Sequence, residues 1–368
     1  MQYRFEAVGD DAAPAQRGGE VQNPLFDLLL ALREQGSIQQ AARAAGVSYR
    51  HLWGALKHWQ QVLGEPLVSW VQGQPARLTP FAERLLWAET RARARLTPHI
   101  EALRSELARV LVEAFDGCQQ ALTVFASHDL ALPLLREHAA ATQSLHIELR
   151  FAGSMDALRA LAAGRCVVAG FHVPPLAPGA NVFARQLKRL LVPGRHKLIG
   201  CARRRQGLLV ARGNPLQIAS LAEATARGLR FVQRQDGSGT QLLLEHLCLA
   251  QGVDIARLAG ARLPAEDSHL AVAAAVASDA ADAGLGIEAA AVRFGLDFVP
   301  LVDEDYYLVC LHDALDQAPV LALRRALQDP RWLDRLAALP GYAGSSGGEV
   351  LSLTGALPWW HFRTPRAR

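Results

Sequence analysis

A loop with two glycines and two hydroxyl side chains, Gly237-Ser238-Gly239-Thr240, is the stretch of this sequence best suited to bind an anion. It follows an apolar segment and precedes a helical pattern that begins near Leu242. Its backbone amides therefore lie at a helix N-terminus, where unpaired N–H groups and the helix dipole both favour negative charge. Glycine lets the backbone approach a ligand closely, and Ser238 and Thr240 add hydroxyl donors. This pattern predicts a small-anion site.

Further candidate ligand contacts come from other loops that follow apolar segments. Ser127 and Ser154 each stand just before a predicted helix, where a serine is either an anion contact or a plain N-cap. Arg234 is placed either to bind the anion with a charge-assisted hydrogen bond or to form a salt bridge across a cleft. The predicted ligand-binding residues are Ser127, Ser154, His172, Arg234, Gly237, Ser238, Gly239, Thr240 and Tyr306.

Motifs of catalysis and metal binding are missing from the sequence. There is no G-x-S-x-G elbow, no Walker loop, no Cys/His pair in a recognisable setting and no metal-ligand spacing. The five cysteines, Cys118, Cys166, Cys201, Cys248 and Cys310, are scattered without C-x-x-C spacing, as in buried thiols of a reducing compartment. We therefore expect no enzyme, no catalytic residue, no metal and no cofactor, and an α/β-based enzyme remains the less favoured alternative.

A helix, a tight turn and a second helix are predicted over residues 36–59. Apolar residues recur at helical spacing over 38–45, after Ser37 as a potential N-cap, and Gly46 suits the turn. Ser48 can cap the polar and basic second helix. This is the arrangement that enters a DNA major groove, although an ordinary helical hairpin has the same periodicity. The predicted DNA contacts are Ser37, Gln39, Gln40, Ser48, Tyr49, Arg50, Lys57 and Arg77.

A β-hairpin and a long helix are predicted after this helix pair. Residues 67–78 hold Gly73, Pro75 and Arg77 between apolar residues, as a hairpin wing needs. Residues 80–115 follow a helical pattern with one potential break at Thr97-Pro98. Such a helix either forms a homodimer, which would pair two DNA-reading heads, or packs on its own chain as a linker. We favour a homodimer or a dimer of dimers on a double-stranded operator.

Composition and pattern give the domain organisation. The chain has 368 residues, of which 50% are hydrophobic, and its net charge of +4 means that any DNA contact is local. Neither a signal segment nor a membrane-spanning run is visible, so we expect a cytoplasmic protein without membrane contact. The predicted domains are a flexible segment 1–22, a winged helix-turn-helix 23–79, a linker or dimerisation helix 80–115 and a ligand-sensing domain 120–368.

The ligand-sensing domain has the pattern of an α/β fold. Strands and helices alternate from Leu122, which predicts a parallel sheet with crossover helices, and HKLIGCA and GLLVARG are two of the predicted strands. The expected lobes comprise residues 120–205 with 310–368, and residues 210–305. No acidic residue lies between Asp156 and Glu223, whereas basic residues are frequent there. That stretch is either a basic surface for an anion or DNA, or a solvated face without a function.

The predicted winged helix-turn-helix domain, the DNA-reading head of the chain, resembles the winged helix of ModE-type molybdate regulators and, more distantly, that of LysR-type regulators. The Ser-Tyr-x-x-x-Trp opening of its second helix favours the ModE side. The matching residues are Gly36-Ser37-Ile38, Gln40-Ala41-Ala42, Gly46-Val47-Ser48-Tyr49, Trp53, Gly64-Glu65-Pro66-Leu67-Val68 and Ala76-Arg77-Leu78-Thr79-Pro80. The resemblance implies a DNA-binding transcription regulator.

The remaining chain resembles the type II periplasmic-binding-protein fold, in particular the sensor domain that accompanies winged-helix heads and molybdenum-cofactor proteins. The small β-barrel domains that bind molybdate in ModE proteins are missing here, so the head alone does not imply molybdate. Together the two resemblances imply a regulator that senses molybdate or tungstate, linked to molybdenum or formate dehydrogenase metabolism. Formate, another small carboxylate and a molybdopterin-like ligand are the alternatives. The matching residues are Arg203, Gln206-Gly207-Leu208, Gly213-Asn214-Pro215, Arg234-Gln235, Gly237-Ser238-Gly239-Thr240, Asp282-Ala283-Gly284-Leu285-Gly286-Ile287, Gly348-Glu349-Val350-Leu351-Ser352-Leu353 and Leu357-Pro358-Trp359-Trp360.

Overall fold

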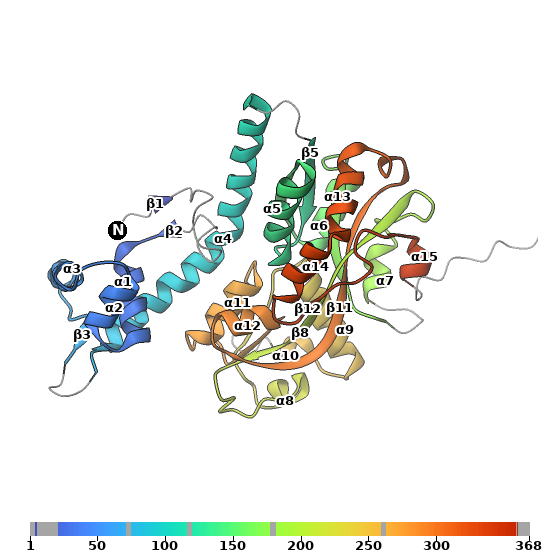
Figure 1. Cartoon of the computed structure of the whole chain (residues 1–368). Coiled ribbons are helices and arrows are strands. Elements are labelled where there is room, and N and C mark those ends of the chain that lie inside the picture. The colour runs from blue at the N-terminus through green and yellow to red at the C-terminus, as the bar shows by residue number, and fades with distance from the viewer. Residues whose placement is uncertain are drawn as a thin grey trace, which may run out of the picture. The chain divides into compact units, whose positions relative to one another are not determined.

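A computed structural model of the chain describes residues 4–5, 21–70, 75–115, 120–176, 182–258, 263–357 and 359. The chain separates into two compact units, Met1–Arg93 and Ala94–Arg368 (Figure 1). The cysteine at position 118, most of the predicted flexible segment 1–22 and the turn of the predicted hairpin lie outside the described residues.

The first unit is the predicted winged helix-turn-helix. Leucines of α1 and small residues of α2 pack against Leu52 and Leu56 of α3, which are fully buried. The short hairpin pairs Val68 with Leu78 in antiparallel register, so the predicted wing is confirmed for its described strands. The elements are α1 (Pro24–Gln35), α2 (Ile38–Ala44), α3 (Tyr49–Leu63), β3 (Val68–Ser69) and β4 (Arg77–Leu78), and β1 (Arg4–Phe5) pairs with β2 (Val21–Gln22).

A long helix, α4 (Pro80–Phe115), follows the wing and runs without interruption through Pro98. The potential break at Thr97-Pro98 is therefore absent, although proline cannot donate to the carbonyl four residues earlier. That carbonyl belongs to Ala94, and it accepts a hydrogen bond from the Ser268 hydroxyl at 3.3 Å instead. A side chain from the α/β body thus satisfies the backbone group that Pro98 leaves free.

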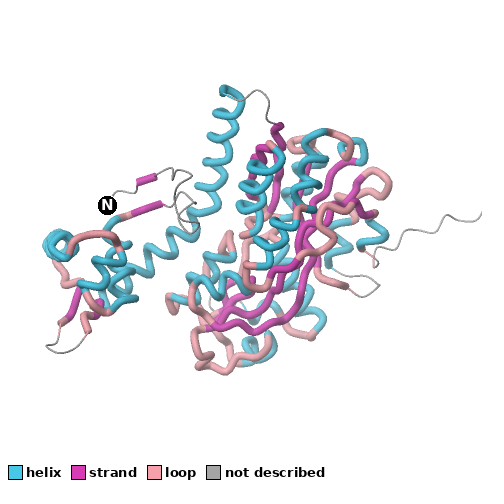
Figure 2. Tube along the Cα trace, viewed as in Figure 1, coloured by secondary structure: helices cyan, strands magenta, loops and turns pink. Residues whose placement is uncertain are grey.

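One curled sheet organises the second unit (Figure 2). Its strands follow the order β6-β5-β7-β11-β8-β10-β9, and β12 and β13 also pair with β8. Strands β5, β6 and β7 are parallel, whereas β11 runs antiparallel to both β7 and β8. The prediction of a parallel sheet was therefore wrong for its centre, and the sheet is mixed. The strands are β5 (Gln120–Ala126), β6 (Leu145–Phe151), β7 (Val168–Val173), β8 (His196–Val210), β9 (Phe231–Val232), β10 (Ala283–Ile287), β11 (Asp297–Leu311), β12 (Tyr342–Ala343) and β13 (Val350–Leu351).

The predicted strand HKLIGCA and the first four residues of the predicted strand GLLVARG belong to the single strand β8, which ends at Val210. The polar residues between them stay in the strand because β11 carries an acidic partner opposite each arginine. Arg203 pairs with Asp305 at 2.9 Å, Arg204 with Glu304 at 2.6 Å, and Arg205 with Asp303 at 3.4 Å. These three arginines of the basic stretch are therefore neutralised within the sheet and add little to a basic surface.

Helices cover both faces of this sheet, and two apolar cores lie on its opposite faces. Adjacent residues of one strand alternate between them, as Leu208 and Leu209 do. The helices are α5 (Ala131–Gln143), α6 (Ser154–Ala162), α7 (Val182–Leu187), α8 (Leu221–Ala226), α9 (Gly239–Ala250), α10 (Ile255–Leu258), α11 (His269–Ala277), α12 (Glu288–Arg293), α13 (Ala318–Gln328), α14 (Pro330–Ala337) and α15 (Leu353–Ala356), with a 3-10 turn at His312–Ala314. None of the described helices is both long and apolar enough to cross a bilayer.

Candidate DNA interface and effector site

The recognition helix of the candidate DNA interface is α3, and the turn before it is built as its sequence predicts. Gly46 has a φ of 67°, the left-handed conformation that glycine tolerates best. The Ser48 Oγ accepts a hydrogen bond from the His51 backbone N–H at 3.1 Å and so caps the helix. Because Leu52 and Leu56 face the core, the opposite face of α3 is left to polar and aromatic side chains.

Seven of the eight predicted DNA contacts are exposed, so their side chains are available to a duplex. Arg50 and Lys57 lie on the exposed face of α3, and the Tyr49 side chain keeps 53% of its surface exposed. Ser37 is half-buried and stands at the N-cap position of α2, but its side chain makes no capping hydrogen bond within the described residues. Its predicted capping role was therefore wrong. The seven exposed residues are Gln39, Gln40, Ser48, Tyr49, Arg50, Lys57 and Arg77.

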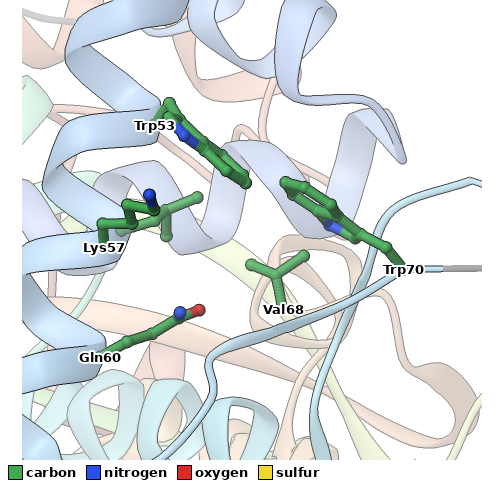
Figure 3. A pocket seen from close by; sticks show the side chains of 6 residues that line it. Trp53, Lys57, Gln60, Val68 and Trp70 are labelled. Atoms are coloured by element: carbon green, nitrogen blue, oxygen red, sulfur yellow. The ribbon is translucent and has the colours of Figure 1, made fainter.

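An aromatic contact joins the recognition helix to the wing (Figure 3). Trp53 of α3 stacks on Trp70, with ring centroids 4.3 Å apart, and Trp70 itself remains half-exposed. The Gln60 side chain also accepts from the Leu67 backbone N–H at 3.1 Å, which positions the start of the wing. Trp53 is thus a packing residue. Trp70 was not predicted from sequence, because it contacts a residue of another element and the two positions are not related by a helix or strand period.

In the second unit, the loop ahead of α6 meets the loop ahead of α9. The Met155 backbone N–H donates to the Gly237 carbonyl at 3.3 Å, and a Cβ on Gly153 would lie 2.6 Å from that same oxygen. A Cβ on Gly239 would in turn lie 3.0 Å from the Ser154 Oγ. Glycine is therefore required at this close approach, which brings the N-termini of two helices together. The structure thus places the predicted loops Gly153-Ser154 and 237–240 beside one another.

His172 lies beside these loops, fully buried, and its imidazole ring stacks on the Tyr306 ring with centroids 4.0 Å apart. Its Nδ1 is 3.3 Å from the Ser127 Oγ, and its Nε2 is 3.4 Å from an Asp129 carboxylate oxygen. Burial and the charge of Arg204 lower the pKa of His172. The ring is therefore neutral at neutral pH, with one N–H donor and one acceptor nitrogen.

A buried ionic network that sequence reasoning missed supports this cluster. The Arg204 guanidinium lies between the carboxylates of Asp129 and Glu304, with N–O distances of 2.5 and 2.6 Å. Tyr342 donates to Asp129 at 2.9 Å, and the Gln206 amide donates to Glu304 at 2.7 Å. Burial alone would raise the pKa of Asp129, but the Arg204 charge, the contact with His172 and the hydrogen bond from the Ala131 backbone N–H together outweigh it and hold this pKa below its usual value.

The Arg234 guanidinium is held by backbone carbonyls among the described residues, and not by the predicted salt bridge across a cleft. Its Nε donates to the Glu266 carbonyl at 3.1 Å and its Nη2 to the Asp267 carbonyl at 2.7 Å. These bonds position the loop that leads to Ser238, because they tie that loop to a neighbouring segment. Burial, together with the charge of Arg204, lowers the pKa of Arg234 to about 10, so it remains charged at neutral pH.

Several buried polar atoms of the cluster have no hydrogen-bond partner among the described residues. Two of them are hydroxyl groups, on Ser154 and Tyr306, and a third is the His269 Nδ1. Two further ones are the acceptor oxygens Gln206 Oε1 and Glu304 Oε2. Because buried polar groups are normally paired, atoms left unpaired inside a cluster mark a place where a ligand can complete the hydrogen bonding. Within the described residues, no group of acidic, His and Cys side chains could hold a metal ion.

A winged helix-turn-helix unit and an α/β unit with a buried polar cluster, joined by a long helix, are the parts of a ligand-responsive DNA-binding transcription regulator. Comparison with known families identifies both units. Residues 135–328, more than half of the chain, match the PBP superfamily domain, so the chain belongs to that superfamily. Residues 25–83 match the bacterial regulatory helix-turn-helix of the lysR family. The chain therefore joins a helix-turn-helix of the lysR family to a PBP superfamily domain, and the preference for a ModE-type head is not supported.

Individual relatives are distant. The uncharacterized protein YvgK of Bacillus subtilis is 29% identical over 229 residues, which cover 62% of this chain and 73% of YvgK. An H2O2-bound cysteine-to-serine mutant of Corynebacterium glutamicum OxyR is 16% identical, with a TM-score of 0.42 over 88% of this chain and 97% of that one. Full-length LysG of Corynebacterium glutamicum with bound effector Arg is 20% identical, with a TM-score of 0.35 over 83% and 96% of the two chains.

Proposed function

We propose that the effector of this regulator is a small oxyanion, with molybdate or tungstate as the first candidates, bound where the N-termini of α6 and α9 adjoin. The observation that carries the proposal is the fully buried Ser154 hydroxyl, which has no partner among the described residues and lies beside Gly239. Amides and hydroxyls at two helix N-termini supply the donors that an oxyanion needs. The regulator would then act in molybdenum or formate dehydrogenase metabolism.

A second class of effector is favoured by the unpaired acceptors Gln206 Oε1 and Glu304 Oε2. A fully deprotonated oxyanion has no hydrogen to donate to them, whereas a molybdopterin-like ligand does. A molybdopterin-like molecule is therefore the alternative that these acceptors favour, while formate or another small carboxylate would use the same donors as molybdate. A thermal-shift screen separates the classes, because a ligand that binds only the folded protein raises its melting temperature.

Removing single hydroxyls tests the site. Ser154→Ala and Ser238→Ala are each expected to weaken molybdate binding about 10-fold or more, since a hydrogen bond to a charged group contributes about 1.5–3 kcal/mol. Isothermal titration calorimetry with sodium molybdate measures the affinity. Ser220→Ala is the matched control, because Ser220 caps α8 as Ser238 caps α9, with no ligand role. Absence of heat for the wild type with molybdate, tungstate and formate would refute the small-anion proposal.

The chain is also proposed to form a homodimer through α4. Four apolar side chains of this helix are about half-exposed, and with Ile100 they follow the alternating four- and three-residue spacing of a coiled-coil seam. They are Leu96, Leu103, Leu107 and Val110. A paired head would read two half-sites of an operator.

Charges on this seam are expected to abolish the dimer. Leu103→Lys combined with Leu107→Lys places like charges on facing helices, which should shift the chain to a monomer in analytical ultracentrifugation at micromolar concentration. Leu249→Lys, at an exposed leucine of α9, is the control and should leave the mass unchanged. A double variant that sediments with the wild type would exclude this seam.

A further inference from the structure

Four residues, Glu266 to His269, contact the long helix α4 on one side and the effector loop, residues 233–240, on the other. This relay segment contacts α4 through three consecutive side chains. The Arg95 guanidinium donates to both Glu266 carboxylate oxygens, at 2.8 and 2.6 Å. Asp267 lies 3.8 Å from the His99 imidazole, and Ser268 donates to the Ala94 carbonyl that Pro98 leaves free.

The same segment holds the effector loop on its other side. The Gln235 backbone N–H donates to the Glu266 carbonyl at 3.0 Å, and the Glu266 N–H donates to the Gln233 carbonyl at 2.9 Å. Arg234 adds two side-chain hydrogen bonds to the carbonyls of Glu266 and Asp267. His269 completes the contact, with its Nε2 3.5 Å from the Thr240 hydroxyl.

Glu266 is therefore shared between two elements. Its carboxylate is held by α4 and its peptide group by the effector loop, and the residue is only 4% exposed. A buried carboxylate held by a bidentate arginine has one strongly preferred position. A shift of the effector loop thus has to move the Glu266 peptide, and the carboxylate then carries α4 with it through Arg95.

We infer that the relay segment transmits the state of the effector site to α4, and that the Arg95–Glu266 ion pair is the contact through which it acts. The inference rests on the proposed function for the identity of the effector, but not for the mechanical connection. It assigns Arg95 and Glu266 a positioning role, since neither of them is a proposed ligand contact. Allosteric coupling of this kind is reciprocal, so α4 also acts on the effector loop.

Hydrogen–deuterium exchange in the full chain tests the connection without any effector. Arg95→Gln is expected to speed exchange several-fold in residues 233–240, which Arg95 does not touch. Arg109→Gln is the matched control, because Arg109 joins α4 to Glu148 of β6, away from the effector loop. Exchange in 233–240 that stays at the wild-type rate in Arg95→Gln, or that rises equally in Arg109→Gln, would overturn the inference. Arg95→Lys keeps the charge and should restore part of the protection.

Operator binding with sodium molybdate as the probe provides the functional test. A typical allosteric coupling changes DNA affinity about 5–150-fold. In Arg95→Gln we expect the ratio of operator affinities with and without molybdate to fall to within about twofold of one. Molybdate affinity itself should stay within threefold of the wild-type value. Full coupling in Arg95→Gln would contradict the relay. Absence of molybdate binding to the wild type would instead refute the proposed effector, and hydrogen exchange would still decide the connection.

Discussion

Arg204→Leu is expected to destabilise the α/β unit by about 3–5 kcal/mol, because it leaves two buried carboxylates, Asp129 and Glu304, without their shared cation. The Arg204 side chain is only 2% exposed, so water cannot replace the lost partner. Urea unfolding followed by circular dichroism measures the change. Arg203→Leu is the control, because Arg203 pairs with Asp305 on the same two strands but is half-exposed, and such pairs contribute at most about 1 kcal/mol. Equal losses of stability for Arg204→Leu and Arg203→Leu would contradict a larger contribution from the buried network than from the exposed ion pair.

The same network predicts a dependence of stability on pH. The pKa of Asp129 is lower in the folded chain than the value of about 3.9 in an unfolded one. Its contribution to stability is therefore present above pH 4 and is lost as the pH falls below that value. In Arg204→Leu the pKa of Asp129 should instead rise through burial, so that stability decreases at a higher pH than in the wild type. Urea unfolding curves of both proteins at pH 3–7 measure the direction of this change and the pH at which it occurs.

Arg50→Ala and Lys57→Ala are expected to weaken operator binding while leaving anion affinity unchanged. A base contact contributes about 1–3 kcal/mol, and two heads on one operator double that loss to about 2–6 kcal/mol, so the affinity should fall about 30- to 2.5 × 10⁴-fold. If Lys57 contacts a phosphate, its removal also reduces the slope of log affinity against log salt by about one per head. Fluorescence anisotropy with a labelled operator measures both effects.

Arg84→Ala is the charge-matched control for these variants, because Arg84 is an exposed arginine of α4 in the same unit, outside the predicted DNA contacts. If both α3 variants bind DNA as tightly as Arg84→Ala does, α3 is not the recognition helix.

The head could be predicted well from sequence because its signals are local. Periodicity, the glycine at position 46 and the capping serine at position 48 act within a few residues, and the structure confirms the resulting helices, turn and wing strands. Ser37 shows the limit of such reasoning, since it has the residue type and the position of a cap without the capping bond.

The α/β unit was harder to predict because its decisive contacts depend on strand register. Arg203–Arg205 and Asp303–Asp305 are about 100 residues apart, and only the antiparallel pairing of β8 and β11 sets them opposite each other. Without that register, the basic stretch looked unpaired and β8 looked like two strands. Arg204, Asp129 and Glu304 were missed at the candidate site for the same reason, whereas the loops before α6 and α9 were found from their glycines and serines.

Selection of bound duplexes from a random DNA pool by the full chain shows whether two copies of the first unit read DNA together. We expect enrichment of an inverted repeat, with half-site centres about 10–10.5 base pairs or a multiple of that apart, and loss of this enrichment in Arg50→Ala. A pool without any enriched sequence, or the same enrichment with Arg50→Ala, would contradict paired reading of DNA by the first unit.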